Sequence, residues 1–332
     1  MIETPRVVVI TGASGGVGRA AAREFARRGA DVGLLARNDD ALVVARQEVE
    51  ALGRRACAIP VDVADARAVS RAADVVAETL GPIDVWVNNA MVTVVSPVAQ
   101  LDADELRRVT DVTYHGTVHG TLAALEHMRP RGVGAIVQVG SALAYRSIPL
   151  QAAYCAAKAA TRAFTDSLRS ELIRERSGVH VTMVHMPALN TPQFDWCRTR
   201  MTHKPQPVAP IFQPEVAARA IAWAATHRRR ELFVGGSTLL AVTGQKLAPG
   251  WLDRYLARNG YDGQLSDEPV EHDRQDNLWE PVSGDLGAQG RFGDRARERS
   301  VGLALSTHRV ELGLLLLALL SIGAAALRPD RE

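Results

Sequence analysis

The distribution of apolar positions predicts an α/β domain over residues 1–235. Seven short apolar runs have the length of strands, at residues 6–11, 31–36, 55–60, 83–88, 134–140, 180–185 and 231–235. The segments between them carry apolar residues at helical spacing, and one of them, ALVVARQEVEALG, ends at Gly53 as a capped helix would. Strands that are apolar throughout indicate a sheet covered on both faces, and their alternation with helices indicates parallel strands. We therefore expect a doubly wound parallel sheet of the Rossmann type, as a single domain with a C-terminal extension.

The pattern changes after residue 235. Residues 236–261 include APGWLDRYLARNG, which predicts a short amphipathic helix with Pro249 near its start and Gly260 after its end. We place this helical extension near the substrate site. Residues 262–308 are polar, rich in Gly, Asp and Arg, and poor in periodic apolar residues, which is typical of a flexible, solvated linker.

A hydrophobic C-terminal helix is expected over residues 309–328, and it allows three interpretations. Its core, LGLLLLALLSIGAAAL at 312–327, carries no charge. A membrane anchor requires about 20 apolar residues, with a lower limit of about 17, so the run is just sufficient if it includes Val310. The alternatives are a helix docked in a dimer or on the domain, and a helix lying in the membrane interface. The long polar linker favours the anchor, because a core helix rarely needs such a tether.

Composition narrows the function classes. The chain has 332 residues, is 47% hydrophobic and carries a net charge of +2, with its Arg residues interleaved with Asp and Glu. This balance argues against a nucleic-acid partner. The cysteines, Cys57, Cys155 and Cys197, have no metal-ligand spacing, which favours a reducing compartment and predicts no metal site. Because the N-terminus runs almost directly into an apolar strand, we expect the domain to stay in the cytoplasm.

A glycine-rich loop joins the first predicted strand to the first helix. In TGASGGVG at 11–18, Gly12, Gly16 and Gly18 allow a tight turn, a close approach of the backbone to a pyrophosphate, and close packing of the helix on the sheet. The N-terminus of the helix also favours phosphate charge. An ordinary strand-to-helix turn is the alternative, but the position between a strand and a helix favours a dinucleotide site.

The end of the second strand predicts which dinucleotide binds. NAD enzymes place an acidic residue here for the ribose 2′-hydroxyl, whereas an arginine accommodates a 2′-phosphate. This chain has Ala36 and Arg37, which favours NADP(H). Arg37 as a solvated surface residue is the alternative, and Asp39 and Asp40 also bear on the choice. Further candidates are Asp62, for the adenine amino group, and the segment NNA that ends the fourth strand, Asn88, Asn89 and Ala90.

Candidate acid–base chemistry lies in QAAYCAAKAATRAF. Tyr154 and Lys158 are one helical turn apart, so their side chains share a face. A free phenol has a pKa of about 10, and a nearby ammonium is expected to lower it, because the attraction at about 4 Å is on the order of 4 kcal/mol. This also explains a lysine in a chain that otherwise prefers arginine. Ser141 follows the fifth strand, where ligands of open α/β sheets bind, and we expect it to hold a substrate oxygen beside Tyr154.

Together these motifs resemble the short-chain dehydrogenase/reductase family, in order and spacing, over roughly residues 5–235. The resemblance rests on TGASGGVG, VDV at 61–63, NNA, the Ser141/Tyr154/Lys158 set and PALNT at 187–191. It implies that Tyr154 is the acid or base, that Lys158 lowers the pKa of Tyr154 and binds the nicotinamide ribose, and that Ser141 orients the substrate. The candidate cofactor contacts are Thr11, Gly12, Ser14, Gly16, Val17, Gly18, Arg37, Asp62, Val63, Asn89, Ala90, Tyr154, Lys158, Pro187 and Thr191.

Three positions depart from the family pattern. Thr113, in VTYHG, stands where the family has an asparagine that disturbs its helix and places a proton-relay water. The threonine hydroxyl has the chemistry to bond a backbone carbonyl or a water, so Thr113 is a candidate catalytic residue, with His115 a weaker substitute. Met91 replaces the glycine of NNAG and Ala188 that of PG, which predicts a narrower or reshaped pocket.

The resemblance implies an NADP(H)-dependent oxidoreductase that moves hydride between the cofactor and a carbonyl or secondary alcohol. We expect a small-molecule carbonyl or alcohol substrate of hydrophobic character, a homo-oligomer and membrane association through the C-terminal helix. The competing hypothesis is a non-catalytic NADP-binding sensor or scaffold, in which Thr113 disables the proton relay.

Overall fold

A parallel sheet forms the centre of the domain in the computed structural model, which describes residues 4–285 and 287–309. Seven strands of the described chain lie in the order β12-β7-β6-β4-β1-β2-β3, and every neighbouring pair is parallel. Their bounds are β1 Val7–Thr11, β2 Asp31–Ala36, β3 Ala56–Pro60, β4 Val85–Asn88, β6 Gly134–Ser141, β7 Val179–Met186 and β12 Glu231–Phe233. The chain order reverses beside β1, and such a switch point opens a crevice at the carboxyl ends of the strands.

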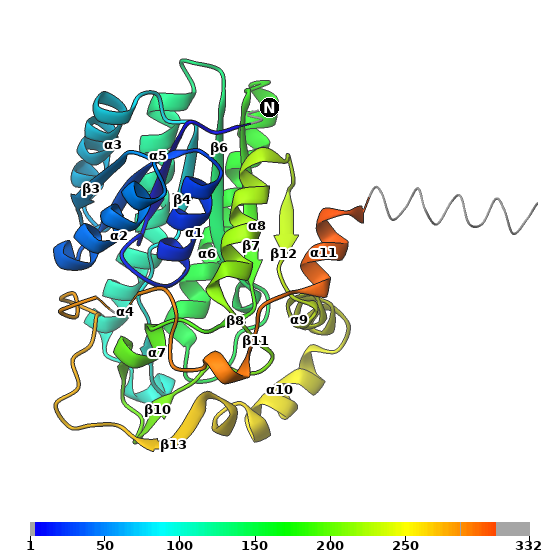
Figure 1. Ribbon diagram of the computed structural model, residues 1–332. Coiled ribbons are helices and arrows are strands. Elements are labelled where there is room, and N and C mark those ends of the chain that lie inside the picture. Colours follow the sequence, from blue (N-terminus) through cyan, green and yellow to red (C-terminus); the bar gives the residue numbers. More distant parts are fainter. Residues whose placement is uncertain (1–3, 286, 310–332) are drawn as a thin grey trace, which may run out of the picture.

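Helices cover both faces of the sheet (Figure 1). One face carries α1 (Gly16–Arg27), α2 (Asp39–Ala51) and α8 (Pro214–Thr226); the other carries α3 (Ala66–Leu80), α4 (Ala103–Thr110), α5 (Gly116–Met128) and α6 (Ala152–Arg174). In β1, Val8 and Ile10 join one core cluster, and Val7 and Val9 join the other. Because alternate strand residues face opposite ways, a strand buried on both sides must be apolar throughout. The predicted doubly wound fold is confirmed.

Local signals fix the helix ends close to the predicted positions. The Asn38 side chain accepts a hydrogen bond from the N–H of Ala41 and starts α2, and Gly53, with a φ of +75°, follows its end. Asp102 and Glu105 form a capping box at α4. The helix predicted around Pro249 is α10 (Pro249–Asn259), which follows α9 (Gly236–Leu247).

Short elements cover the carboxyl edge of the sheet. Here α7 (Gln193–Trp196) follows the short strand β8 (Ala188–Leu189), and β11 (Ile211–Phe212) pairs with β8 and with β14 (Ala296–Arg297). Two further pairs join β5 (Val94–Val95) to β9 (Arg198–Thr199), and β10 (His203–Pro205) to β13 (Leu265–Pro269). The remaining elements are α11 (Val301–Thr307) and the single turns η1 Val98–Gln100, η2 Asp111–His115, η3 Ala142–Ala144, η4 Asp262–Gln264 and η5 Gly293–Arg295.

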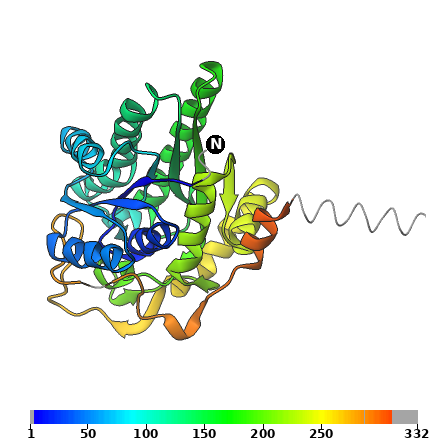
Figure 2. The same cartoon turned by 45° about the horizontal axis from the view of Figure 1, so that its top comes forward.

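Residues 262–308 differ from the solvated linker that the sequence predicts. In the described part of this segment, β13 and β14 each pair with a strand of the domain, and the Leu278 side chain is fully buried. Figures 1 and 2 show the orange part of the chain running back along the carboxyl edge of the sheet toward α2 and α4. The segment stays on the domain because its backbone carbonyls accept hydrogen bonds from arginines of the domain, among them Arg37 and Arg108.

The proposed division into domains stays a prediction. The hydrophobic helix expected at 309–328 lies outside the described residues, apart from Arg309. Among the helices of residues 4–285 and 287–309, none combines the length and the apolar composition that a membrane crossing requires.

Candidate active site

A cavity of about 490 Å³ opens at the carboxyl ends of the central strands. Most of the residues that the sequence nominates line it: Gly12, Ser14, Gly16, Val17, Arg37, Asp62, Val63, Asn89, Ala90, Ser141, Tyr154, Lys158, Pro187 and Thr191. Three others, Thr11, Gly18 and Thr113, are buried behind this lining. The sheet therefore gathers residues from β1 to β7 at one place, as the topology predicts.

The glycine-rich loop requires its glycines. Gly12 has a φ of +67°, and a Cβ there would lie 2.9 Å from the Cα of Ala90. At Gly18, a Cβ would lie 2.1 Å from the carbonyl oxygen of Gly12. The helix α1 begins at Gly15 and Gly16, which have no side chain to cap it, so its N-terminus presents backbone N–H groups. Such a cradle, closed to any Cβ and positive in potential, fits the pyrophosphate of a dinucleotide.

Thr11 and Asn89 hold this loop against β4. The Oγ1 of Thr11 accepts hydrogen bonds from the N–H groups of Asn89 and Ala90, at 2.9 and 3.1 Å. The Nδ2 of Asn89 donates to the carbonyls of Thr11 and Gly12, at 3.0 and 3.2 Å. Asn88 instead belongs to a buried polar network with neighbouring side chains. These residues position the loop, and of them Asn89 and Ala90 also reach the cavity.

The end of β2 lies against the C-terminal segment. The guanidinium of Arg37 donates to the carbonyls of Asn277, Leu278 and Trp279, the last at 2.7 Å. Burial, together with the nearby charge of Arg108, lowers the pKa of Arg37. Arg37 is therefore a partly buried residue bonded to three backbone carbonyls and not a solvated surface arginine. Arg108, which sequence analysis missed, also pairs with Asp62 and donates to Leu278.

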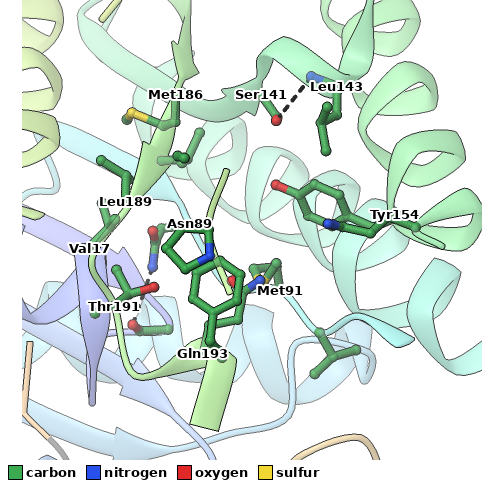
Figure 3. A pocket seen from close by; sticks show the side chains of 18 of the residues that line it. Val17, Asn89, Met91, Ser141, Leu143, Tyr154, Met186, Leu189, Thr191 and Gln193 are labelled. Atoms are coloured by element: carbon green, nitrogen blue, oxygen red, sulfur yellow. Dashed lines mark hydrogen bonds between the residues drawn. The ribbon is translucent and has the colours of Figure 1, made fainter. Parts of the chain in front are cut away.

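Tyr154, Lys158 and Ser141 converge on the same part of the cavity. The Lys158 ammonium lies 5.7 Å from the centre of the Tyr154 ring and donates to the carbonyl of Val139 at 2.6 Å. The Ser141 hydroxyl accepts a hydrogen bond from the N–H of Leu143 at 3.1 Å, which fixes its direction. Figure 3 shows the Tyr154 hydroxyl pointing toward the strand end that carries Ser141. The predicted catalytic group is thus assembled in space, with the exception of Thr113.

Burial determines the protonation of this group. It raises the pKa of Tyr154, although the Ser141 hydroxyl acts in the opposite direction. It also lowers the pKa of Lys158 to about 8. The expected lowering of the Tyr154 pKa by Lys158 is therefore wrong for this arrangement, because the loss of hydration around the phenol dominates and the ammonium is bonded to Val139. Tyr154 keeps its proton at neutral pH.

Thr113 lies at a π-helical turn, η2, between α4 and α5. Its side chain is fully buried, and its hydroxyl donates to the carbonyl of Val92 at 3.0 Å and accepts from the N–H of Val92 at 3.1 Å. The helix is thus disturbed locally, as in the family pattern, but the hydroxyl is bonded to backbone behind the cavity. Thr113 is a positioning residue for the loop at Val92, which corrects its nomination as catalytic. His115 bonds Asp111 on the exposed side of the turn.

Many of the side chains that line the cavity are apolar. Met91 and Ala188, which depart from the family pattern, both line it, and Figure 3 shows Met91 and Met186 among the side chains of the lining. Tyr255 and Leu256 of α10 also line the cavity, within the extension that the sequence placed near the substrate site. Sequence analysis missed other lining residues, which come from short elements, from loops and from the C-terminal segment. They are Leu143, Ile148, Phe194, Trp196, Val208, Asn277, Pro281, Val282 and Gly284.

Comparisons with known proteins identify the family of the chain. The sequence model of the short chain dehydrogenase family matches residues 6–200. The uncharacterized oxidoreductase YxnA of Bacillus subtilis is 33% identical over 281 residues, covering 84% of this chain and 79% of the relative. The 3beta-hydroxysteroid dehydrogenase 1 of Eggerthella lenta is 32% identical over 255 residues, covering 74% of this chain and 95% of the relative.

A solved structure shares the fold. It is an alcohol dehydrogenase from Thermococcus sibiricus complexed with 5-hydroxy-NADP, with a TM-score of 0.60 and 27% identity, covering 69% of this chain and 95% of the other. The sheet order, the glycine-rich loop, the Ser141/Tyr154/Lys158 group and these matches lead to one assignment. The chain belongs to the short-chain dehydrogenase/reductase family of oxidoreductases.

Proposed function

We propose that this protein is an NADP(H)-dependent oxidoreductase that reduces a hydrophobic ketone or oxidises the corresponding secondary alcohol. The observation that carries the proposal is the meeting of Tyr154, Lys158 and Ser141 in the cavity that the glycine-rich loop also lines. A proton donor, a cation and a hydroxyl beside a dinucleotide cradle are the groups that hydride transfer to a carbonyl requires.

Tyr154, Ser141 and Lys158 have different roles when a ketone is reduced. Tyr154 holds its proton at neutral pH, because burial raises its pKa, and donates it to the substrate oxygen. Ser141 donates a hydrogen bond to the same oxygen and stabilises the charge that develops there. The Lys158 ammonium, 5.7 Å from the phenol ring, stabilises the tyrosinate that forms. A nicotinamide held in this cavity would supply the hydride.

NADP(H) is the proposed cofactor. Ala36 ends β2 without a carboxylate to repel a 2′-phosphate, and Arg37 follows it. The Thermococcus sibiricus neighbour was solved with an NADP derivative, which supports the same choice. Gly12, Gly16 and the N-terminus of α1 would hold the pyrophosphate, and Asp62 lies where the adenine is expected.

The apolar lining of the cavity favours a bulky alicyclic substrate. Met91, Met186, Phe194, Tyr255 and Leu256 offer no charge to a substrate beyond the reacting carbonyl. The relative from Eggerthella lenta is named for a hydroxysteroid, a substrate of this kind. We propose a steroid-like or comparably hydrophobic ketone.

A second function, that of a non-catalytic NADP sensor, is favoured by one observation. The Thr113 hydroxyl is fully buried and donates its proton to the carbonyl of Val92, so that proton is not available to a relay. Under this hypothesis, the cofactor binds but its hydride is not transferred.

The test is the oxidation of NADPH and of NADH by the full chain with short water-soluble ketones, aldehydes, quinones and ketosteroids. The proposal predicts turnover with NADPH, and a larger kcat/KM for ketosteroids than for short ketones. Cofactor binding without turnover of any compound would support the sensor. Faster turnover with NADH would overturn the cofactor assignment alone.

A further inference from the structure

A stretch of the C-terminal segment, residues 277–285, lies across the adenosine end of the cavity. We refer to these residues as the strap. Its carbonyl oxygens accept hydrogen bonds from donors of the domain: the strap carbonyls of residues 277–279 bind Arg37, and those of Val282 and Gly284 bind the Nδ2 of Asn38 at 2.6 and 3.0 Å. Just beyond the strap, the carbonyl of Gly287 accepts from the N–H of Gly16 at 3.1 Å.

These donors are the ones that a dinucleotide needs. Arg37 and Asn38 follow β2, where the ribose and its 2′-substituent bind in this fold, and Gly16 opens α1, where a pyrophosphate binds. In the described structure, neutral carbonyl oxygens accept the hydrogen bonds of these donors. A phosphate is the stronger acceptor for a guanidinium, but the exchange requires the carbonyls to leave.

The strap is built to stay in place. Leu278 is fully buried in the core cluster on the face of the sheet that α3, α4, α5 and α6 cover, although it stands in a polar stretch of sequence. Asp285 pairs with the buried Arg19 through two hydrogen bonds, at 3.0 and 3.3 Å. Arg108 adds a hydrogen bond to the Leu278 carbonyl at 3.0 Å. Burial of one leucine and a two-point ion pair are contacts that a loose surface tail does not make.

From these contacts, and resting on the proposed NADP(H) function, we infer that the strap is a specificity element that competes with the 2′-phosphate for Arg37. NADP(H) binds only when the strap releases the guanidinium, whereas NAD(H), which has no 2′-phosphate, does not compete for Arg37. The docked strap therefore lowers the affinity for NADP(H) more than that for NAD(H), because the apparent affinity falls with the fraction of molecules in which Arg37 is free.

The test uses two full-length variants that loosen the strap through different contacts. Leu278→Ala removes its buried side chain, and Asp285→Ala removes its pair with Arg19. Dissociation constants for NADPH and NADH are measured by titration of nicotinamide fluorescence, with unfolding curves to show that each variant is folded. The control is Glu175→Ala, which breaks an exposed ion pair with Arg129 at the opposite edge of the sheet.

We expect both variants to bind NADPH about tenfold more tightly than the wild type, with a smaller change for NADH and none in the control. Adding Arg37→Gln to either variant should abolish the gain. Unchanged or weaker NADPH binding in folded variants would overturn the inference and leave the proposed function standing. Failure of every form, wild type included, to bind either cofactor would overturn both.

Discussion

The alkaline limb of the pH–rate profile tests the role of Lys158. Burial lowers the pKa of this ammonium to about 8, below its usual 10.5, so its charge is lost as the pH rises through 8. The charged fraction falls from about nine-tenths at pH 7 to about one-tenth at pH 9, and a reaction that needs the ammonium slows roughly tenfold. Burial raises the pKa of Tyr154, so the phenol keeps its proton over this range. The fall in rate at alkaline pH therefore reports the deprotonation of Lys158.

The assay is kcat/KM for ketone reduction at saturating NADPH between pH 7 and pH 9. In Lys158→Arg, we expect a lower rate but no limb, because a guanidinium stays charged throughout. Lys246, an exposed lysine of α9, provides the matched control: Lys246→Arg should keep the wild-type profile. A flat profile in the wild type, or an unchanged limb in Lys158→Arg, would refute this reasoning.

Three further predictions follow from single contacts. Gly18→Ala places a Cβ 2.1 Å from a backbone oxygen of the phosphate loop, so the loop must shift, and titration should show NADPH affinity reduced roughly tenfold or more. Thr113→Val leaves the N–H and carbonyl of Val92 without their hydroxyl partner, and urea unfolding should show a loss of about 1–3 kcal/mol. For Glu231, burial raises the pKa, but hydrogen bonds from a histidine and a tyrosine outweigh it and hold the pKa at about 2, below the usual 4.5. The stability that this contributes is present above pH 4.5 and is lost as the pH falls toward 2; it amounts to about 3 kcal/mol, and acid unfolding of Glu231→Gln should lack this loss.

The central sheet could be predicted because its physical cause is local. A strand buried on both faces must be apolar at every position, and runs such as that at β1 satisfy this condition within a few residues. The glycines of the phosphate loop could also be predicted, because Gly12 and Gly18 stand where no Cβ fits. The spacing of Tyr154 and Lys158 likewise places them on one helical face, because residues four apart lie one turn from each other.

The remaining features depend on contacts distant in sequence. The strap is held mainly through its backbone carbonyls, which every residue has, and Leu278 is a single apolar residue in a polar run. The partner of Thr113 is likewise a backbone group, that of Val92, which no composition reveals. The pKa of Tyr154 depends on how deeply the phenol is buried, and spacing alone does not fix that.

The most direct test of the central claim is a single-turnover measurement of NADPH oxidation by Tyr154→Phe, with Tyr261→Phe, at an exposed tyrosine, as the control. If Tyr154 donates the proton, the rate should fall by about 10²–10⁴-fold while the dissociation constant for NADPH stays the same. A Tyr154→Phe rate within a few-fold of the wild type would show that the proton comes from another group, and the proposed catalytic role of Tyr154 would be wrong.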